Sequence, residues 1–409
     1  MSTADTIQSR SLAHISFSAR WEDETGHHTA LHHFEKFNVW RDLDLLPAAI
    51  ADDILGQTVG IGSPHLFNAG ELVEPFSSDN IRQIPTQNFS GRFANGQPIE
   101  PRVGRFYPQG MISGIEGIYS ENRFPTRLIE QRDNHYRFDF NHPLSQAKMS
   151  LTPQIHAILP GQNEHGGRCN DVLLEMLRGP GMQLPYPGVA TDYLSGEPFR
   201  RVDESSDSEF YRRDRLVHHL DATARQQLSR LYAELIPSQS QVVDLMASWE
   251  SHLPQRLELA AVIGVGMNQH ELDANPRLSE RLVHDLNQHP LVPLPKSRFD
   301  AVICSASVEY LIDPVSVFSA VREILAPGGR FIVTFSNRWF PAKAIALWSE
   351  MHEFERPGLV IDYFRRAGWQ GPINTLSLRG LSRPAGDPHY ATTELSDPLF
   401  AIWSDKEAL

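Results

Sequence analysis

The sequence is poor in cysteine, with only Cys169 and Cys304 among its 409 residues. Two cysteines so far apart in the chain exclude a disulfide-rich scaffold and a cysteine-rich zinc module. They also suit a reducing compartment. The first thirty residues lack the apolar segment that a secretory signal peptide has. We therefore expect a cytoplasmic protein.

Long apolar runs and an excess of positive charge are missing as well. No run approaches the roughly 18–20 apolar residues that a membrane-spanning helix needs. Lys and Arg number 37 against 50 Asp and Glu, which gives a net charge of −13. Binding to nucleic acid or to anionic lipid needs a basic face, so we expect neither partner. At roughly 100–200 residues per domain, the length indicates two or three domains.

The chain up to about residue 159 has mainly strand patterns. Strands are predicted over His14–Arg20, 124–131, 136–140 and 149–159, the first because apolar and polar residues alternate strictly. A helix is predicted over 44–55, with Pro47 in its first turn and Gly56 at its end. The stretch 76–119 is rich in Gly, Pro, Asn and Gln and predicts an inserted, loop-rich β subdomain.

The second half alternates between strand and helix patterns, after a region with little periodic hydrophobicity. Strands are predicted over 242–246, 260–265, 281–284, 299–305 and 330–336, with two closing strands at 373–378 and 398–403 that can pair. Helices are predicted over 222–235, 315–325 and 360–367, the first capped by Asp221. This alternation predicts a doubly wound α/β sheet.

Ligands of such a sheet bind at the carboxyl ends of its strands. The candidate binding residues after the first four strands are Asp244, Met246, Ser248, Gly266, Met267, Asn268, Asp285, Leu286, Asn287 and Ser305. The candidate residues for contact with a substrate, and thus for catalysis, are Glu309, Tyr310, Asn337 and Arg338. These side chains are expected to converge on one rim of the sheet.

The region from about 221 to 406 resembles the class I S-adenosylmethionine-dependent methyltransferases of type 11. The resemblance lies in VVDLMASW, VIGVGMNQHEL, HDLNQHPLVPLPKSRFDAVICSASVEYLIDP and VREILAPGGRFIVTFS, and the chain looks like a member of the branch written LDLM-SW-SHLP followed by GMN-EL. It implies S-adenosylmethionine as the cofactor, a Rossmann-like fold and a terminal antiparallel hairpin. It also implies Asp285 as the acceptor for the adenine amino group.

Two positions depart from that family's pattern. The first loop lacks its GxG glycines, because Met246 to Trp249 occupy it. Gly266 stands where the family has an acid that accepts hydrogen bonds from the ribose hydroxyls. Asn268 could supply a neutral carbonyl oxygen there instead. Because methyl transfer needs mainly positioning and desolvation, no residue is singled out as a base.

The region from about 12 to 159 resembles the FKBP-type peptidyl-prolyl isomerases of the SlyD kind. The resemblance lies in HISFSARWEDETG, LLPAAIADDILGQTVGI, NIRQIPTQNF with VGRFYP, and TRLIEQRDNHYRFDFNHPLSQAKMSLTPQIHAIL. It implies an FKBP-like α+β domain over 10–160, with an insert in the flap at about 77–125. It further implies a proline pocket, which we place at Trp40, Leu45, Phe67, Phe140, His142 and Leu144.

The order of domains is then an FKBP-like domain, a connector over 161–213 and a methyltransferase-like domain over 214–409. The paired histidines, such as His27-His28 and His32-His33, are adjacent residues that point apart, so no metal site is predicted. His218-His219 is read in the same way.

The resulting prediction is a methyltransferase fused to an isomerase- or chaperone-like domain, with a protein, a peptide or a small molecule as methyl acceptor. Two alternatives stay open. One is a chaperone or assembly factor in which both sites are degenerate, and the other is a small-molecule methyltransferase with a structural N-terminal domain. The oligomeric state is left open.

Overall fold

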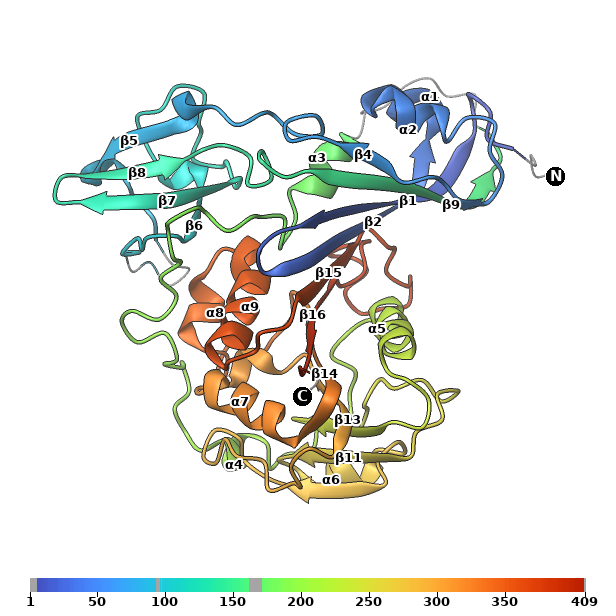
Figure 1. Cartoon of the computed structure of the whole chain (residues 1–409), viewed down its shortest axis with the longest axis vertical. Coiled ribbons are helices and arrows are strands. Elements are labelled where there is room, and N and C mark those ends of the chain that lie inside the picture. The colour runs from blue at the N-terminus through green and yellow to red at the C-terminus, as the bar shows by residue number, and fades with distance from the viewer. Residues whose placement is uncertain (1–5, 93–95, 97, 162–170, 408–409) are drawn as a thin grey trace. The chain divides into compact units, whose positions relative to one another are not determined.

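The computed structural model describes residues 6–92, 96, 98–161 and 171–407, which divide into two compact units. The first unit comprises Met1–Ser195, Glu350–Arg356 and Ser377–Leu381, and the second comprises Gly196–Ser349, Pro357–Leu376 and Ser382–Leu409 (Figure 1). The described part of the expected connector therefore belongs to folded units: 171–195 to the first and 196–213 to the second. Within these residues, no helix has both the length and the apolar character needed to cross a bilayer.

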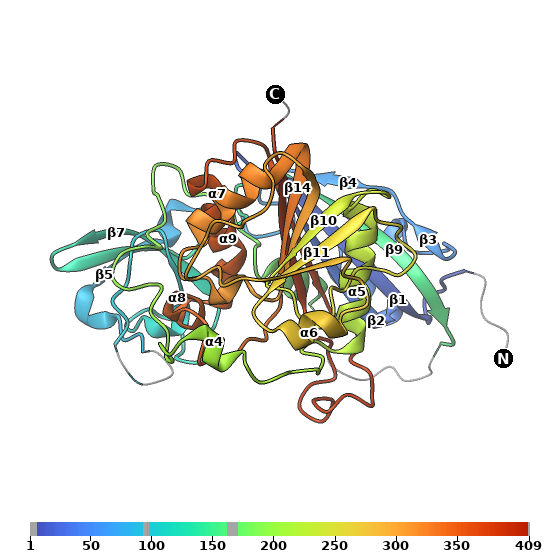
Figure 2. The same ribbon diagram turned by 90° about the horizontal axis from the view of Figure 1, so that it is seen from below.

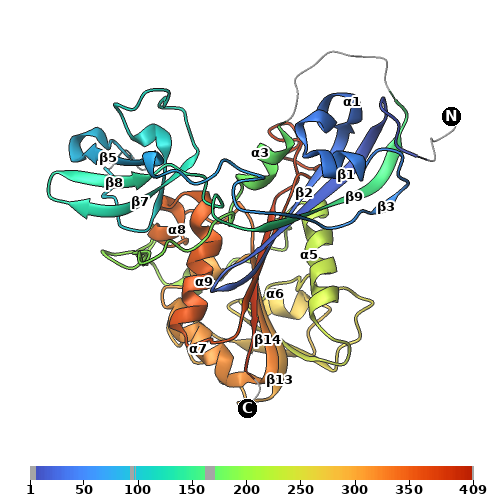
Figure 3. The ribbon, with the colours of Figure 1, turned by 45° about the horizontal axis from the view of Figure 1, so that its top comes forward.

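The first unit is built on an antiparallel sheet in which β1 lies between β2 and β9. Its strands are β1 (Leu12–Glu22), β2 (Gly26–Asn38), β9 (Met149–Leu159), β3 (Gly60–Ile61) and β4 (His65–Phe67), the last two pairing with β9. The alternation predicted for β1 is present, and Ile15, Phe17 and Ala19 form part of the core on one face of the sheet. Figure 3 shows the three long strands side by side.

The helix predicted over 44–55 is broken into shorter pieces. The structure has α1 (Val39–Asp42), a 3-10 turn η1 (Leu43–Leu45) and α2 (Ala48–Asp52). Leu46, which precedes Pro47, is extended with ψ 155°, and Pro47 is the N-cap of α2. A residue before proline avoids the helical conformation, which explains the break.

The predicted insertion forms a small sheet of its own with the order β5-β8-β7-β6. Its strands are β5 (Ile81–Pro85), β6 (Phe106–Pro108), β7 (Pro125–Arg132) and β8 (His135–Asp139), with the 3-10 turns η2 (Ser78–Asn80), η3 (Thr86–Asn88) and η4 (Gln109–Met111). Ile84, Tyr107, Leu128 and Phe138 make a separate core for it. Within the expected connector, α3 (Val172–Leu177) is capped by Asp171 and contributes Val172 and Met176 to the main core.

The second unit contains the predicted doubly wound sheet, with the strand order β12-β11-β10-β13-β14-β16-β15. The strands are β10 (Gln241–Leu245), β11 (Ala261–Gly266), β12 (Glu280–Val283), β13 (Phe299–Ser305), β14 (Leu325–Phe335), β15 (Ile373–Arg379) and β16 (Leu399–Asp405). The first five are parallel neighbours, whereas β16 runs antiparallel to β14. The two predicted closing strands, β15 and β16, are neighbours in the sheet.

Helices cover both faces of this sheet. They are α4 (Asp207–Phe210), α5 (Ala222–Leu235), α6 (Gln269–Ala274), α7 (Pro314–Ile324), α8 (Ala346–Glu350) and α9 (Arg356–Arg366), with the 3-10 turn η5 (Val308–Tyr310). The 3-10 turn η6 (Glu353–Glu355) belongs to the first unit. Figures 2 and 3 place α5 on one face and α7 and α9 on the other. One crossover is unusual: residues 246–260, all of them described, contain no helix between the parallel neighbours β10 and β11.

Candidate functional site

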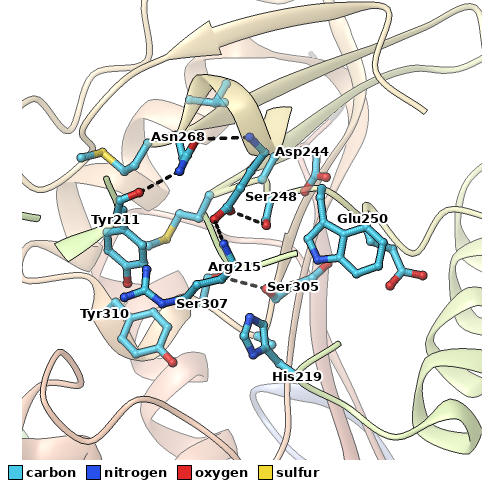
Figure 4. Close-up of a pocket in the computed structure, with 18 of the residues that line it drawn as sticks. Tyr211, Arg215, His219, Asp244, Ser248, Glu250, Asn268, Ser305, Ser307 and Tyr310 are labelled. Atoms are coloured by element: carbon cyan, nitrogen blue, oxygen red, sulfur yellow. Dashed lines mark hydrogen bonds between the residues drawn. The ribbon is translucent and has the colours of Figure 1, made fainter. Parts of the chain in front are cut away.

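A cavity opens at the carboxyl ends of the parallel strands in the second unit (Figure 4). Every residue predicted to bind the cofactor lines it: Asp244, Met246, Ser248, Gly266, Met267, Asn268, Asp285, Leu286, Asn287 and Ser305. Of the residues predicted to contact a substrate, Tyr310 lines it too. The sheet thus gathers residues from four separate strand ends around one space.

Asp244 is the second-last residue of β10, and its side chain is buried and lines the cavity. Its Oδ2 atom has no hydrogen-bond partner among the described residues. Burial raises the pKa of this carboxyl to about 7, against the opposing effect of a hydrogen bond from Ser251. A buried acceptor without a partner is costly, and a cationic donor in the cavity would satisfy it.

The turn after β10 keeps a glycine-like backbone without a glycine. Met246 has φ 55°, in the left-handed region that side chains disfavour. His252 and Ala306, which line the same cavity, have φ values of 57° and 47°. Strained backbone of this kind is held by the surrounding fold and concentrates at functional sites. Met246 therefore adopts, without a glycine, the left-handed conformation that favours glycine.

Gly266, at the end of β11, has no room for a side chain. A Cβ atom there would lie 2.2 Å from the carbonyl oxygen of Ala247. The loop after β10 is in turn held on β11 by a hydrogen bond from the Ala247 N–H to the Val265 carbonyl, at 2.8 Å. This close approach explains why glycine replaces the acid that the family resemblance predicts at this position.

A carboxylate reaches the cavity from α6 instead. The Glu271 side chain is buried, its Oε2 atom accepts from the Ser248 hydroxyl at 2.6 Å, and its Oε1 atom accepts from the Arg215 backbone N–H at 2.7 Å. Asn268, expected to offer a carbonyl oxygen, uses that atom to cap α6 by accepting from the His270 and Glu271 N–H groups. Glu271 was not singled out from the sequence, although it lies five residues after Gly266.

Residues after β12 close another wall of the cavity. Asp285 accepts the backbone N–H of Asn287 at 2.9 Å through Oδ1, which makes a turn. The Asn287 side chain is used inside the protein: Nδ2 donates to Asp207 and to the Tyr310 carbonyl, and Oδ1 accepts from Ile312. Any contact of Asn287 with a ligand is therefore expected from its backbone.

One whole wall of the cavity was not predicted from the sequence, because the expected connector has little periodic hydrophobicity. The cavity residues that it contributes, together with the segment just after it, are Asp207, Tyr211, Arg215, Val217, His218, His219 and Leu220. Asp207 holds this wall in place: it receives two bonds from Arg201 at 2.7 and 2.9 Å and lies 3.3 Å from the Lys343 ammonium. The only sequence signal was the density of aromatic and basic residues in FYRRDRLVHH.

One end of the cavity is aromatic and carries a fixed cation. The Arg215 guanidinium lies over the rings of Phe210, Tyr211 and Phe340, at 4.3, 5.7 and 5.6 Å from their centroids. The Phe340 ring also contacts His219 and stacks on Tyr310. The Tyr310 hydroxyl accepts from the Phe340 backbone N–H at 2.8 Å, and burial raises its pKa. This end suits a flat or apolar group rather than a strongly hydrated one.

A second charged group sits beside the cavity on the loop after β10. Glu250 lies 2.8 Å from the Nδ1 atom of His218, and 3.6 Å from both Arg225 and His252. Burial alone would raise the pKa of Glu250, but His252, Arg225 and His218 together lower it to about 2. Glu250 is therefore an anion that orders this loop.

Three residues predicted to contact a substrate do not reach the cavity. Glu309 is adjacent to Tyr310 on a 3-10 turn, and its buried side chain does not line the cavity. Asn337 is exposed, and Arg338 pairs with Asp397 at 3.4 Å. None of these three side chains lines the cavity, and their part in substrate contact stays a prediction.

The residues predicted to form a proline pocket in the first unit are dispersed. Leu45, Phe140 and His142 line a groove, whereas Phe67 and Leu144 pack with the hydrophobic core and Trp40 is 47% exposed. His142 accepts the Leu144 N–H, and burial together with the charge of Arg178 lowers its pKa to about 4. The six residues therefore do not surround one pocket as expected.

Comparisons with known proteins bear on the second unit. Residues 248–333 match the model of the type 11 family described as a methyltransferase domain. The match begins at Ser248, within the altered loop. Together with the strand order, it supports a methyltransferase domain in the C-terminal part of the chain. No curated protein matches the chain, and nothing found supports an FKBP-like first unit.

Solved structures similar to this chain include three methyltransferase structures. A Haloferax volcanii putative methyltransferase in complex with the Trm112 activator is 16% identical over 45% of this chain and 91% of the other, with a TM-score of 0.33. A putative methyltransferase from Bacillus halodurans is 12% identical over 44% of this chain and 99% of the other, with a TM-score of 0.32. A possible histamine N-methyltransferase from Thermotoga maritima is 18% identical over 47% of this chain and 92% of the other, with a TM-score of 0.35.

Proposed function

We propose that the second unit binds S-adenosylmethionine in this cavity and catalyses transfer of its methyl group to an acceptor. The observation that carries the proposal is the buried Asp244 Oδ2 atom, which faces the cavity without a hydrogen-bond partner among the described residues. The α-ammonium of a methionine moiety is a donor of the required charge. A carboxylate that meets a cation in a buried site gives a strong, charge-assisted hydrogen bond.

Other cavity residues are proposed to contact the ribose and the adenine of the cofactor. Glu271 offers carboxylate oxygens for the ribose hydroxyls, in place of the acid that Gly266 excludes. Asp285, whose Oδ1 atom is held by the turn, offers Oδ2 to the adenine amino group. The cofactor supplies an electrophilic methyl group on a sulfonium, and the protein supplies position and exclusion of water.

The aromatic end of the cavity is the proposed place of the acceptor. His219 lies there against Phe340, and burial, aided by the charge of Arg215, lowers its pKa. A neutral imidazole at the cavity is able to take a proton from an acceptor that starts protonated.

The first unit is proposed to bind peptide segments, which would make the acceptor a protein or a peptide. The groove that contains Leu45, Phe140 and His142 is the feature that favours this role. Isomerase activity is a finer prediction that the dispersed pocket residues weaken. An isomerisation assay on a proline-containing peptide tests it, and a rate no greater than the uncatalysed rate would exclude it.

Isothermal titration of the whole chain with S-adenosylmethionine and with S-adenosylhomocysteine tests the main proposal. We expect binding in the micromolar range, weakened about tenfold or more in Asp244→Asn, because a charge-assisted hydrogen bond contributes about 1.5–3 kcal/mol. A matched control is Asp300→Asn, because Asp300 is exposed and lies near the start of β13, at the opposite end from the cavity residue Ser305. Absence of binding by folded protein would overturn the proposal in favour of the chaperone alternative.

The pH dependence of cofactor binding gives a second prediction. Because the pKa of Asp244 is raised from 3.8 to about 7, the folded protein holds a proton there between these values that the unfolded chain has lost. Folding stability from this group is therefore complete below pH 4 and declines toward pH 7, by at most about 1.4 kcal/mol per pH unit.

A cationic ligand must displace the same proton, so its affinity is expected to increase as the pH rises to 7. Denaturation and titration series from pH 5 to 8 measure both slopes, and equal slopes in wild type and Asp244→Asn would contradict the assignment.

A third prediction concerns Gly266→Ala. The new methyl group would lie 2.2 Å from a backbone oxygen, so the loop after β10 must move. We expect a loss of roughly 1–3 kcal/mol in the free energy of unfolding, as overpacking usually costs, together with weaker cofactor binding. Urea denaturation and titration measure the two effects. Gly386→Ala is the matched control, because a Cβ there meets no described atom within 4 Å. A Gly266→Ala protein that behaves like this control would show that the close approach has no importance.

A further inference from the structure

Three histidines from different strands meet on the main sheet of the first unit. His14 lies on β1, His33 on β2 and His156 on β9, and these strands run side by side (Figures 1 and 3). The three residues are 19 to 142 positions apart in the sequence, from 14 to 156. Their association is therefore a product of the strand pairing and not of a local motif.

The strand pairing places these side chains on one face of the sheet. Ser16 of β1 pairs with His33 of β2 on one side and with Gln154 of β9 on the other. His14 lies two residues before Ser16 and His156 two residues after Gln154, so side-chain alternation puts all three histidines on the same face. A bulge, in which Ala157 pairs with His14 and Ile155 with Ile15, leaves His156 as the extra residue beside His14.

The three rings present nitrogen atoms at distances that suit a metal ion. One ring nitrogen of each histidine lies within 4.8 Å of the corresponding nitrogens of the other two. His14 Nε2 is 3.1 Å from His33 Nδ1, and the ring centroids are 4.5 to 5.3 Å apart. Tetrahedral zinc with bonds of about 2.0–2.1 Å needs ligand nitrogens roughly 3.3 Å apart. Small rotations of the rings are enough to reach that spacing.

The surroundings of the cluster also resemble those of a histidine metal site. The Ser16 hydroxyl lies 2.8 Å from His156 Nε2, which fixes the orientation of that ring. Such an outer partner of a ligand ring is a general feature of histidine sites. Glu35, two residues after His33 on the same strand, adds a negative charge that acts on His14.

We propose that His14, His33 and His156 form a binding site for one divalent transition-metal ion, zinc or nickel. Imidazole nitrogen is a preferred ligand of both ions. Bound to all three rings, the ion would link β1, β2 and β9. Any ligand that binds only the folded protein raises its stability, so the metal is expected to raise the melting temperature of the protein. The proposal does not depend on the activity of the second unit.

Titration of the chelator-treated whole chain with ZnCl2 and with NiCl2 tests the site. We expect saturable binding of one ion per chain, and a loss of at least tenfold in affinity in each of His14→Ala, His33→Ala and His156→Ala. The matched control is His27→Ala, on the same strand as His33, where the exposed side chain pairs with Glu22. The control is expected to bind like the wild type.

A second measurement covers variants that fail to fold. Cobalt(II) added to the wild-type protein is expected to give the visible absorption of a tetrahedral site with nitrogen ligands, and zinc is expected to abolish that absorption by competition. The proposal is overturned if neither zinc nor nickel binds to the wild type. It is also overturned if the folded triple variant, with all three histidines replaced, binds as tightly as the wild type.

Discussion

Asp207→Ala is expected to lower the free energy of unfolding by about 3–5 kcal/mol, the usual result of removing one partner from a buried ion pair. Asp207 is buried and receives two hydrogen bonds from Arg201 and one from Asn287. Its removal leaves the Arg201 guanidinium buried without its bidentate partner. It also releases the wall that carries Tyr211 and Arg215, so cofactor affinity is expected to decrease as well. Urea denaturation and isothermal titration measure these two effects.

The chain offers a matched control in the same segment. Asp203 also lies 3.3 Å from Lys343, but it is accessible to water. Asp203→Ala is therefore expected to change the stability less than Asp207→Ala, because the buried Lys343 ammonium keeps Asp207 and the Ser205 carbonyl as partners. If Asp207→Ala and Asp203→Ala unfold alike, the buried network does not hold the wall of the cavity.

Glu271→Gln is expected to weaken S-adenosylmethionine binding by about 10- to 100-fold, since hydrogen bonds to a charged group contribute about 1.5–3 kcal/mol. The substitution keeps the shape of the side chain and removes its charge. The Glu271 carboxylate accepts from the Ser248 hydroxyl and from the Arg215 backbone N–H. The same carboxylate is proposed to accept from the ribose hydroxyls. Titration of the wild type and the variant, at a pH where both are folded, gives the ratio of affinities.

A ligand without ribose hydroxyls separates direct contact from a general disturbance of the site. Adenosine is expected to bind more tightly than 2′,3′-dideoxyadenosine in the wild type, and that preference should largely disappear in Glu271→Gln. Asp273→Asn serves as the control, because its side chain lies on the same helix and is 56% exposed. An unchanged preference in Glu271→Gln would assign the ribose to another residue.

Much of the second unit follows from its sequence. The apolar runs that become β10, β11 and β13 are short, continuous and spaced as in a parallel sheet, and the residues after them line the cavity. Parallel strands that are buried on both faces give this signal strongly. The rule that ligands bind at the carboxyl ends of such strands then located the candidate residues without the structure.

Other parts could not be deduced because their order depends on contacts between distant residues. The segment around Asp207 has no periodic pattern, and it is fixed by ion pairs to Arg201 and Lys343 and by Asn287. The three histidines of the first unit meet only because β2 and β9 pair with β1 in one particular register. The visible histidine pattern in the sequence is the adjacent pairs, and these pairs do not predict that His33 meets His14 and His156 from two other strands.

The left-handed turn at Met246 also has a consequence for the wall of the cavity. Where the family resemblance predicts bare glycine backbone, this chain places a thioether side chain, and Met267 lines the same space. Methionine is unbranched and polarisable, and it fills gaps by rotating about single bonds. This wall can therefore deform by side-chain rotation and without displacement of the backbone, so donor analogues with groups larger than methyl meet an adaptable surface.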